Sequence, residues 1–120
     1  MNDSVLRTKS KEFAKSIVLL CRKLKEERVE TVLLNQLLRA GTSVGANIHE
    51  AQYAQGTKDF VSKFEIALKE CNESEYWLEL LKETDCLSEE EYVAMRNACI
   101  ELRRMLVSSV TKLKNNQVEL

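Results

Sequence analysis

The sequence has no proline and only three glycines among its 120 residues. Proline breaks helices and glycine ends many of them, so long segments of this chain can continue as helix until a cap or a turn stops them. No segment alternates apolar and polar residues with a period of two, which argues against β-strands. The sequence therefore favours an all-α protein of a single small domain.

Membrane spans, a secretion signal and metal-ligand spacings are also missing. No run approaches the roughly 20 apolar residues that cross a bilayer, and the N-terminal residues contain no apolar signal region. The four cysteines form no C-x-x-C pair, and the chain has one histidine to join them as a ligand. We expect a cytoplasmic protein with reduced, mostly buried thiols, no membrane association, no metal and no other cofactor.

The arrangements that carry most enzyme chemistry are absent as well. One histidine on a helix gives no basis for a Ser-His-acid site, and the paired E-x-x-H motifs of di-iron bundles do not occur. The G-T-S-V-G run at residues 41–45 lacks the spacing of a phosphate-binding loop. We therefore expect no catalytic residues and a protein that is not an enzyme.

Apolar residues recur at helical spacing in four segments of the chain. The pattern predicts one domain over residues 1–120, with helices at about 3–26, 31–55, 57–84 and 88–115. Long helices joined by short polar loops must pack antiparallel to their neighbours in sequence. The predicted fold is an up-down-up-down antiparallel four-helix bundle.

Three signals predict where these helices begin and end. The second helix is expected to end near Gly56, and Thr57 to cap the third. Ser88 followed by Glu91 is a capping-box signature for the fourth helix, whose polar tail is expected to fray from Asn115 onward.

Gly41 and Gly45 lie four residues apart, on one face of the second predicted helix. Glycine inside a helix costs roughly 1 kcal/mol relative to alanine, so both positions need a compensating reason. A face of small residues allows another backbone to approach closely. The sequence favours a tight helix crossing inside the bundle over a contact between subunits.

Polar side chains follow these glycines among residues that the pattern predicts to be buried. Asn47 and Glu50 share a helix face and can hydrogen-bond to each other, or to Asp59 or Glu70 on the next helix. An internal structural network is the favoured interpretation, and an oligomer contact or a ligand site are the alternatives. His49 lies one position off that face and is expected to be exposed.

Charge is segregated along the chain although the net charge is only −1. Residues 1–28 hold 8 basic and 4 acidic side chains, whereas residues 65–91 hold 2 basic and 10 acidic ones. Glu75, Glu79 and Glu83 form one acidic column on the third predicted helix, and a basic column on the first predicted helix consists of Arg7, Lys11 and Lys15. Either both columns are solvated, or they match helices or subunits electrostatically.

Residues 96–116 hold five basic side chains and one acidic one. These cations can form a modest phosphate-binding strip on the last predicted helix: Arg96, Arg103, Arg104, Lys112 and Lys114. Aromatic residues for base stacking are not interleaved with them, so the signal for RNA or DNA binding is weak.

The motifs of the central segment resemble those of a known family. Residues 39–51 read RAGTSVGANIHEA, followed by D-F at 59–60, I-A-L-K-E at 66–70 and E-Y-W-L at 75–78. This pattern is similar to the bacterial four-helix-bundle family also called ribosomal protein "S23", after members encoded in intervening sequences of large ribosomal RNA genes. Asn47, Glu50, Asp59 and Glu70 match motif positions of that family, and the match covers nearly the whole chain.

The resemblance implies a four-helix protomer that assembles as a ring-shaped homopentamer. It also implies a relation to the accessory variability protein of diversity-generating retroelements, which binds nucleic acid and a reverse transcriptase. The leading hypothesis is a non-enzymatic homo-oligomeric scaffold or adaptor that presents a surface to a protein partner. The alternatives are an RNA- or DNA-binding accessory factor and, third, an enzyme or small-molecule sensor built around Asn47 and Glu50.

Overall fold

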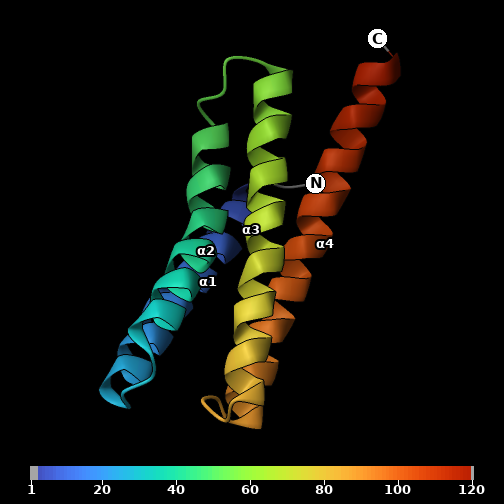
Figure 1. Cartoon of the computed structure of the whole chain (residues 1–120). Helices are drawn as coiled ribbons and strands as arrows, with labels where there is room; N and C mark the ends of the chain where they lie inside the picture. Colours follow the sequence, from blue (N-terminus) through green and yellow to red (C-terminus); the bar gives the residue numbers. More distant parts are fainter. Residues whose placement is uncertain (1–2, 120) are drawn as a thin grey trace.

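Four α-helices follow one another along the chain: α1 (Asp3–Glu26), α2 (Thr31–Ala51), α3 (Thr57–Glu83) and α4 (Glu89–Glu119). The structure is a computed structural model that describes residues 3–119, and the side chains of residues 4–116. Each helix packs against the next one in sequence, and α4 returns to α1, so the bundle is antiparallel (Figure 1). The predicted all-α four-helix fold is confirmed, and the described part of the chain contains no strand.

The start of α4 is held by the capping box that the sequence predicts. The Ser88 amide donates to the Glu91 carboxylate at 3.0 Å, and the Glu91 amide donates to the Ser88 hydroxyl at 3.1 Å. The prediction that Thr57 caps α3 is wrong, because Gly56 occupies the cap position and no side chain satisfies it. Instead, the Asp59 carboxylate accepts a hydrogen bond from the Gln55 amide at 3.2 Å and closes the turn before the helix.

Two helix ends differ from the sequence prediction. α2 ends at Ala51 rather than near Gly56, and residues 52–54 continue as tight turns with i→i−3 hydrogen bonds. Ala51 is the last buried residue of the stripe on α2, so the segment after it has no apolar face to hold it as an α-helix. α4 continues past Asn115 to Glu119, in a stretch where neither glycine nor proline stops it.

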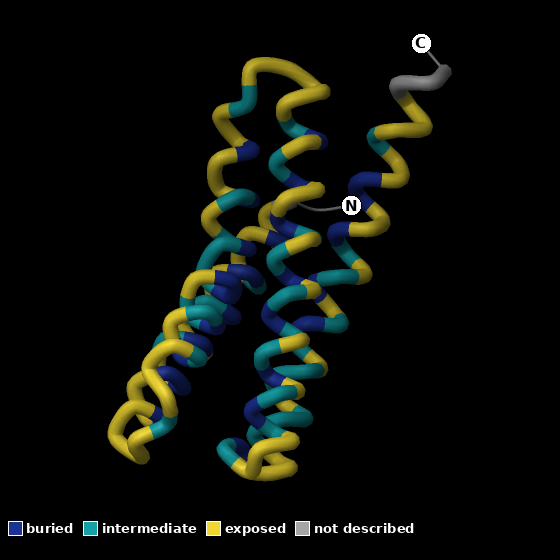
Figure 2. Tube along the Cα trace, viewed as in Figure 1, coloured by how far each residue is buried: buried dark blue, intermediate teal, exposed yellow. Residues whose placement is uncertain are grey.

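The core lies along the axis of a molecule that measures 53 × 22 × 20 Å. Buried residues lie on the inner face of every helix, and exposed residues lie mainly on the outside and in the loops (Figure 2). Phe64 and Leu78 on α3 and Leu102 and Leu106 on α4 are among the largest fully buried side chains. Burial of such side chains supplies roughly 1.5–3 kcal/mol each, so this single core stabilises the whole bundle.

Candidate functional site

Gly41 and Gly45 bring α2 directly against α1. A Cβ atom added at Gly41 would lie 2.7 Å from Cγ1 of Ile17, and one added at Gly45 would lie 3.3 Å from the carbonyl oxygen of Ser10. Ile17 and Ser10 are buried on α1. The two glycines therefore allow a close crossing of α1 and α2 within the protomer.

The structure separates the polar residues that the sequence grouped around Asn47. The amide of Asn47 donates to the carbonyl oxygen of Ser43 at 2.8 Å, one turn earlier in the same helix. Glu50 forms an ion pair with Lys63 of α3 at 3.0 Å. Among the described residues, Asn47 and Glu50 thus bond neither to each other nor to Asp59 or Glu70, and the Asn47 amide is satisfied by its own helix backbone.

Glu70 belongs to a polar cluster that covers the seam between α2 and α3. Arg39 of α2 donates to the Glu70 carboxylate at 2.9 Å and also pairs with Glu73. The indole nitrogen of Trp77 donates to Glu73 at 3.1 Å. His49 lies apart from this cluster, is exposed and packs its ring 5.6 Å from that of Tyr53.

The acidic column on α3 is divided between two environments. Glu75 is half-buried and forms an ion pair with Arg103 of α4. Glu79 and Glu83 are exposed, and neither has an ion-pair partner in the described part of the chain. Glu75 therefore connects α3 to α4, whereas Glu79 and Glu83 form an exposed acidic surface.

The basic column on α1 is exposed along its length. Arg7, Lys11 and Lys15 have no ion-pair partner among the residues that the structure describes. They border a groove of about 790 Å³ between α1 and α2, whose floor includes Gly45. Leu19, 62% exposed, lies one turn beyond Lys15 on the same outer face.

The basic residues of α4 do not form one free strip. Arg103 pairs with Glu75, and Lys114 pairs with Glu65 at 3.0 Å. Arg96 is half-buried, with its guanidinium carbon 5.6 Å from the centre of the Tyr92 ring. Arg104 and Lys112 remain exposed and without an ion pair in the described chain, so two of the five predicted phosphate contacts stand free.

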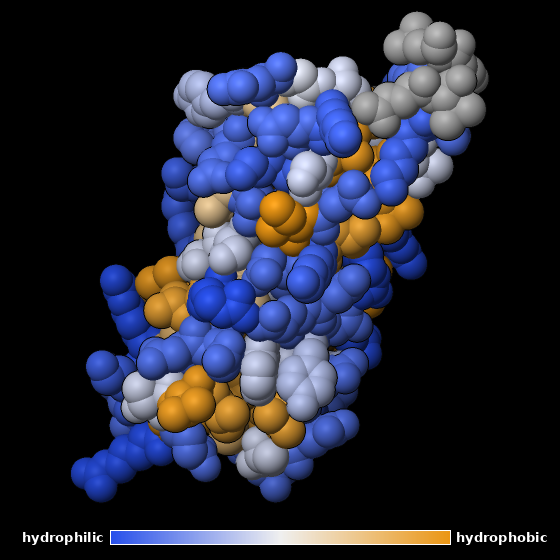
Figure 3. Space-filling view, turned by 45° about the horizontal axis from the view of Figure 1, so that its top comes forward, coloured by the Kyte–Doolittle hydropathy of each residue, from blue (hydrophilic) through white to orange (hydrophobic). Residues whose placement is uncertain are grey.

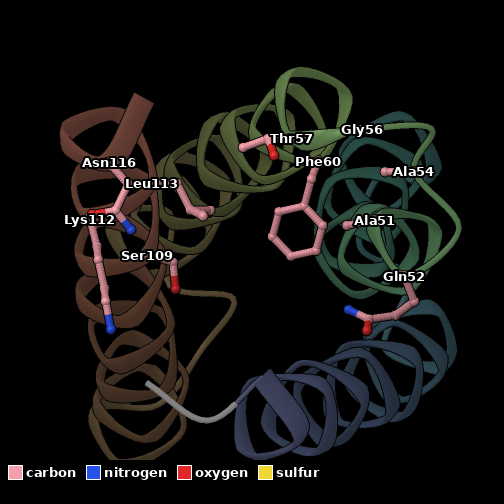
Figure 4. Close-up of a pocket in the computed structure, with 10 residues that line it drawn as sticks. All are labelled: Ala51, Gln52, Ala54, Gly56, Thr57, Phe60, Ser109, Lys112, Leu113 and Asn116. Atoms are coloured by element: carbon pink, nitrogen blue, oxygen red, sulfur yellow. The ribbon is translucent and has the colours of Figure 1, made fainter. Parts of the chain in front are cut away.

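A cavity of about 540 Å³ opens where α4 leaves the bundle near the α2–α3 loop. Figure 4 shows the Phe60 ring projecting into the space between the helices, with Leu113 and Lys112 on the α4 side. The rest of the surface is mixed: on the face drawn in Figure 3, apolar side chains form small patches separated by polar ones. No helix in residues 3–119 is long and apolar enough to cross a membrane.

All four cysteines are free thiols, and three of them are buried. Burial raises the pKa of the Cys21 thiol to about 11. Cys71 and Cys99, by contrast, meet each other across the α3–α4 seam. Among the described residues, no group of three or more histidine, cysteine or acidic side chains could hold a metal ion.

Comparison with known proteins decides the family. The model of the 23S rRNA-intervening sequence protein family matches residues 2–108. The chain belongs to this family. A crystal structure from the same S23 ribosomal protein family, of a Bacteroides thetaiotaomicron protein whose function is described as unknown, is 48% identical to this chain. That match covers 92% of this chain and 99% of the other, with a TM-score of 0.89, and no curated protein matches the chain.

Sequence reasoning missed the partners in the seams of this S23-family bundle. Arg39, Lys63 and the contact between Cys71 and Cys99 were not singled out. The charge blocks indicated that helices could attract each other, but pairing needs the relative rotation of the helices. The cysteines carried no signal of proximity, since 28 residues separate them along the chain.

Proposed function

We propose that this S23-family protein is a non-enzymatic homo-oligomeric scaffold or adaptor that presents a surface to a protein partner. One observation carries the proposal: the exposed charged residues of the two columns have no ion-pair partner among the residues that the structure describes. These are Arg7, Lys11 and Lys15 on α1, and Glu79 and Glu83 on α3.

The remaining charges make this observation informative. Every ion pair in the described chain joins two different helices, so ion pairs within the protomer connect neighbouring helices. α1 packs against α2 and α4, and so does α3, so the two helices that carry the columns lie at opposite corners of the bundle (Figure 4). Opposite charges on opposite corners favour head-to-tail contacts between copies.

Apolar side chains accompany both columns. Leu19 is 62% exposed beside the basic column, and Tyr76, 57% exposed, precedes Glu79 by one turn of α3. Charges alone contribute little at a hydrated surface, whereas an apolar contact with a charged rim resembles the anatomy of stable interfaces. A heterologous contact closes into a ring when its rotation allows, and the family resemblance implies five protomers.

Light scattering on a size-exclusion column tests this proposal. The wild type at low salt is expected at five protomer masses, and the variant Glu79→Lys/Glu83→Lys at one. Both substituted positions are exposed, and Glu75 stays in place to keep its bond to Arg103. The control Glu30→Lys/Glu90→Lys makes the same change in net charge at exposed acids outside the column and should still assemble.

A charge swap separates the contact from a general effect of charge. Lys11→Glu/Lys15→Glu should disperse the ring, and joining these changes to Glu79→Lys/Glu83→Lys in one chain should restore it. In the joined variant the charges at positions 11, 15, 79 and 83 are all reversed, so the attraction between these positions is retained. A wild type that elutes as a monomer, or a swap that fails to restore assembly, contradicts the scaffold proposal.

Nucleic-acid binding is the second candidate, and Arg104 and Lys112 favour it because both are exposed and unpaired in the described chain. A ring would multiply such weak sites. Titration of the protein with structured RNA at two salt concentrations tests this function, since phosphate contacts weaken steeply with salt. A salt-sensitive RNA complex that Arg104→Gln/Lys112→Gln abolishes would place this function first.

A further inference from the structure

Cys71 of α3 and Cys99 of α4 face each other inside the bundle. Both side chains are completely buried, and the Cys71 thiol donates a hydrogen bond to the carbonyl oxygen of Cys99, with sulfur and oxygen 3.3 Å apart. The two helices are antiparallel neighbours at this level. The seam therefore contains two buried thiols whose side chains also interact with each other, and neither belongs to the interfaces proposed above.

Charged groups lie one turn further along each helix. Glu75 follows Cys71 by four residues, Arg103 follows Cys99 by four residues, and Glu75 and Arg103 form an ion pair across the same seam. This arrangement holds a partly exposed guanidinium close to the buried thiols. A neighbouring cation stabilises a thiolate, which is the nucleophilic form of cysteine.

These surroundings shift the pKa values of the two thiols in opposite directions. Interaction with the side chain of Cys99 lowers the pKa of Cys71, and the charge of Arg103 acts in the same direction, whereas burial and the charge of Glu75 oppose this effect. Interaction with the side chain of Cys71, together with burial, raises the pKa of Cys99 above its usual range. Cys21 is buried without such neighbours, and the pKa of that thiol is raised to about 11.

We propose that Cys71 and Cys99 are a redox-active pair that a peroxide oxidises to a disulfide bond between α3 and α4. Cys71 is the attacking thiolate, Cys99 is the resolving thiol, and Arg103 is a positioning residue that stabilises the thiolate. The bond would fix the α3–α4 seam covalently at this level, independently of whether the protein assembles.

The chemistry balances with hydrogen peroxide as the oxidant. The Cys71 thiolate attacks one peroxide oxygen, the O–O bond breaks, and the departing hydroxide takes up a proton to leave water and a sulfenic acid on Cys71. The sulfur of Cys99 then attacks the sulfenic sulfur, the S–O bond breaks, and the hydroxide leaves as water with the proton of Cys99. Two thiols are oxidised to one disulfide, and one peroxide is reduced to two waters.

Thiol counting on the full chain tests the proposal. Reduced protein is treated with hydrogen peroxide, unfolded, alkylated with N-ethylmaleimide and analysed by mass spectrometry before and after proteolysis. We expect two of the four thiols to be lost together and the peptides that contain Cys71 and Cys99 to be linked. Protein that keeps both thiols, or that links any other pair, overturns the proposal.

Matched variants separate the two roles. Cys86→Ser changes a thiol outside the pair and should leave the linkage intact, whereas Cys99→Ser should stop oxidation at a Cys71 sulfenic acid that dimedone traps. Circular dichroism checks that Cys99→Ser still folds. If it does not, the wild type decides alone, since its thermal midpoint should be higher after peroxide treatment and return to the starting value after reduction.

The role of Arg103 has its own readout. The rate of linkage in Arg103→Gln should rise with pH at higher values than in the wild type, because the thiolate loses its neighbouring cation. Arg104→Gln removes an exposed charge from the next residue and should keep the wild-type pH profile. Identical profiles for the wild type and both variants would remove Arg103 from the proposal.

Discussion

α1 meets its two neighbours in the bundle by different means. Against α2 it makes a close crossing, in which Gly41 leaves room for Ile17 and Gly45 approaches the backbone at Ser10. Against α4 its polar contacts are made by long side chains, through the ion pairs Lys9–Glu101 and Lys23–Glu91. The glycines, which lack side chains, allow α1 and α2 to approach closely. Long flexible side chains connect α1 and α4.

The two seams also differ in extent. A close crossing tolerates little change in helix separation, whereas charged side chains of several rotatable bonds can span a range of separations. α1 and α4 are accordingly the neighbours that touch least, and the cavity beside Phe60 lies where α4 leaves the other helices (Figure 4). α1 is therefore packed more extensively against α2 than against α4.

The largest effect is expected when a glycine of the close crossing between α1 and α2 is replaced by a larger residue. Gly41→Leu should lower the free energy of unfolding by about 3 kcal/mol, because the new side chain must displace Ile17 and part α1 from α2. Urea denaturation followed by circular dichroism measures the loss. Gly56→Ala is the control, since an added Cβ there meets nothing within 4 Å and should change stability by less than about 0.5 kcal/mol.

A smaller effect locates the contact at Ile17. Ile17→Ala removes the carbon atoms that a Gly41→Ala methyl would meet at 2.7 and 2.9 Å. The double variant should therefore be more stable than the sum of the single losses, with a coupling of about 1 kcal/mol in a double-mutant cycle. Strict additivity would show that the two residues do not constrain each other.

The seam between α1 and α4 should respond much less. A double-mutant cycle on Lys9→Ala and Glu101→Ala is expected to give a coupling of about 0.5 kcal/mol, since both side chains are largely hydrated. The coupling should fall as salt is added, unlike the coupling between Ile17 and Gly41. A salt-independent coupling above that of the glycine seam would reverse the ranking of the two seams.

The smallest expected effect is a dependence on pH at the other ion pair of this seam. The hydrogen bond from Lys23 holds the pKa of Glu91 below its usual range, and the Ser88 amide adds to this effect. A lowered pKa in the folded state stabilises the protein above the usual glutamate range, and the contribution is lost as pH falls through the lowered value. Thermal unfolding between pH 7 and pH 3 should show a shallower acid decline for Glu91→Gln than for Glu90→Gln.

Local sequence signals predicted the elements well where the interaction itself is local. The Ser88 and Glu91 capping box joins residues three apart, and the four helical stripes were visible in the spacing of apolar residues. The predicted end of α2 was wrong because the helix ends where its apolar face no longer packs against the core, and this point is not visible in the sequence. The cap assigned to Thr57 was wrong because Asp59 closes that turn from inside the helix.

The ion-pair partners in the candidate sites could not be predicted from the sequence, for a different reason. Glu50 could be placed on a helix face, but its pairing with Lys63 depends on the rotation of α3 against α2. The division of the acidic column, with Glu75 bound to Arg103 and Glu83 exposed, follows from the same geometry. The spacing of residues along a helix predicts which of them share a face. Which residues of another helix contact that face depends on how the helices pack.

The order of the helices also bears on the kinetics of folding. All seams except the one between α1 and α4 join helices adjacent in sequence, so most of the bundle forms from contacts that need only short loops to close. Closure of α4 onto α1 brings together opposite ends of the chain and carries the greatest loop entropy. Fast folding of three seams, followed by the docking of two terminal helices through Lys9 and Glu101, is the sequence of events that this topology favours.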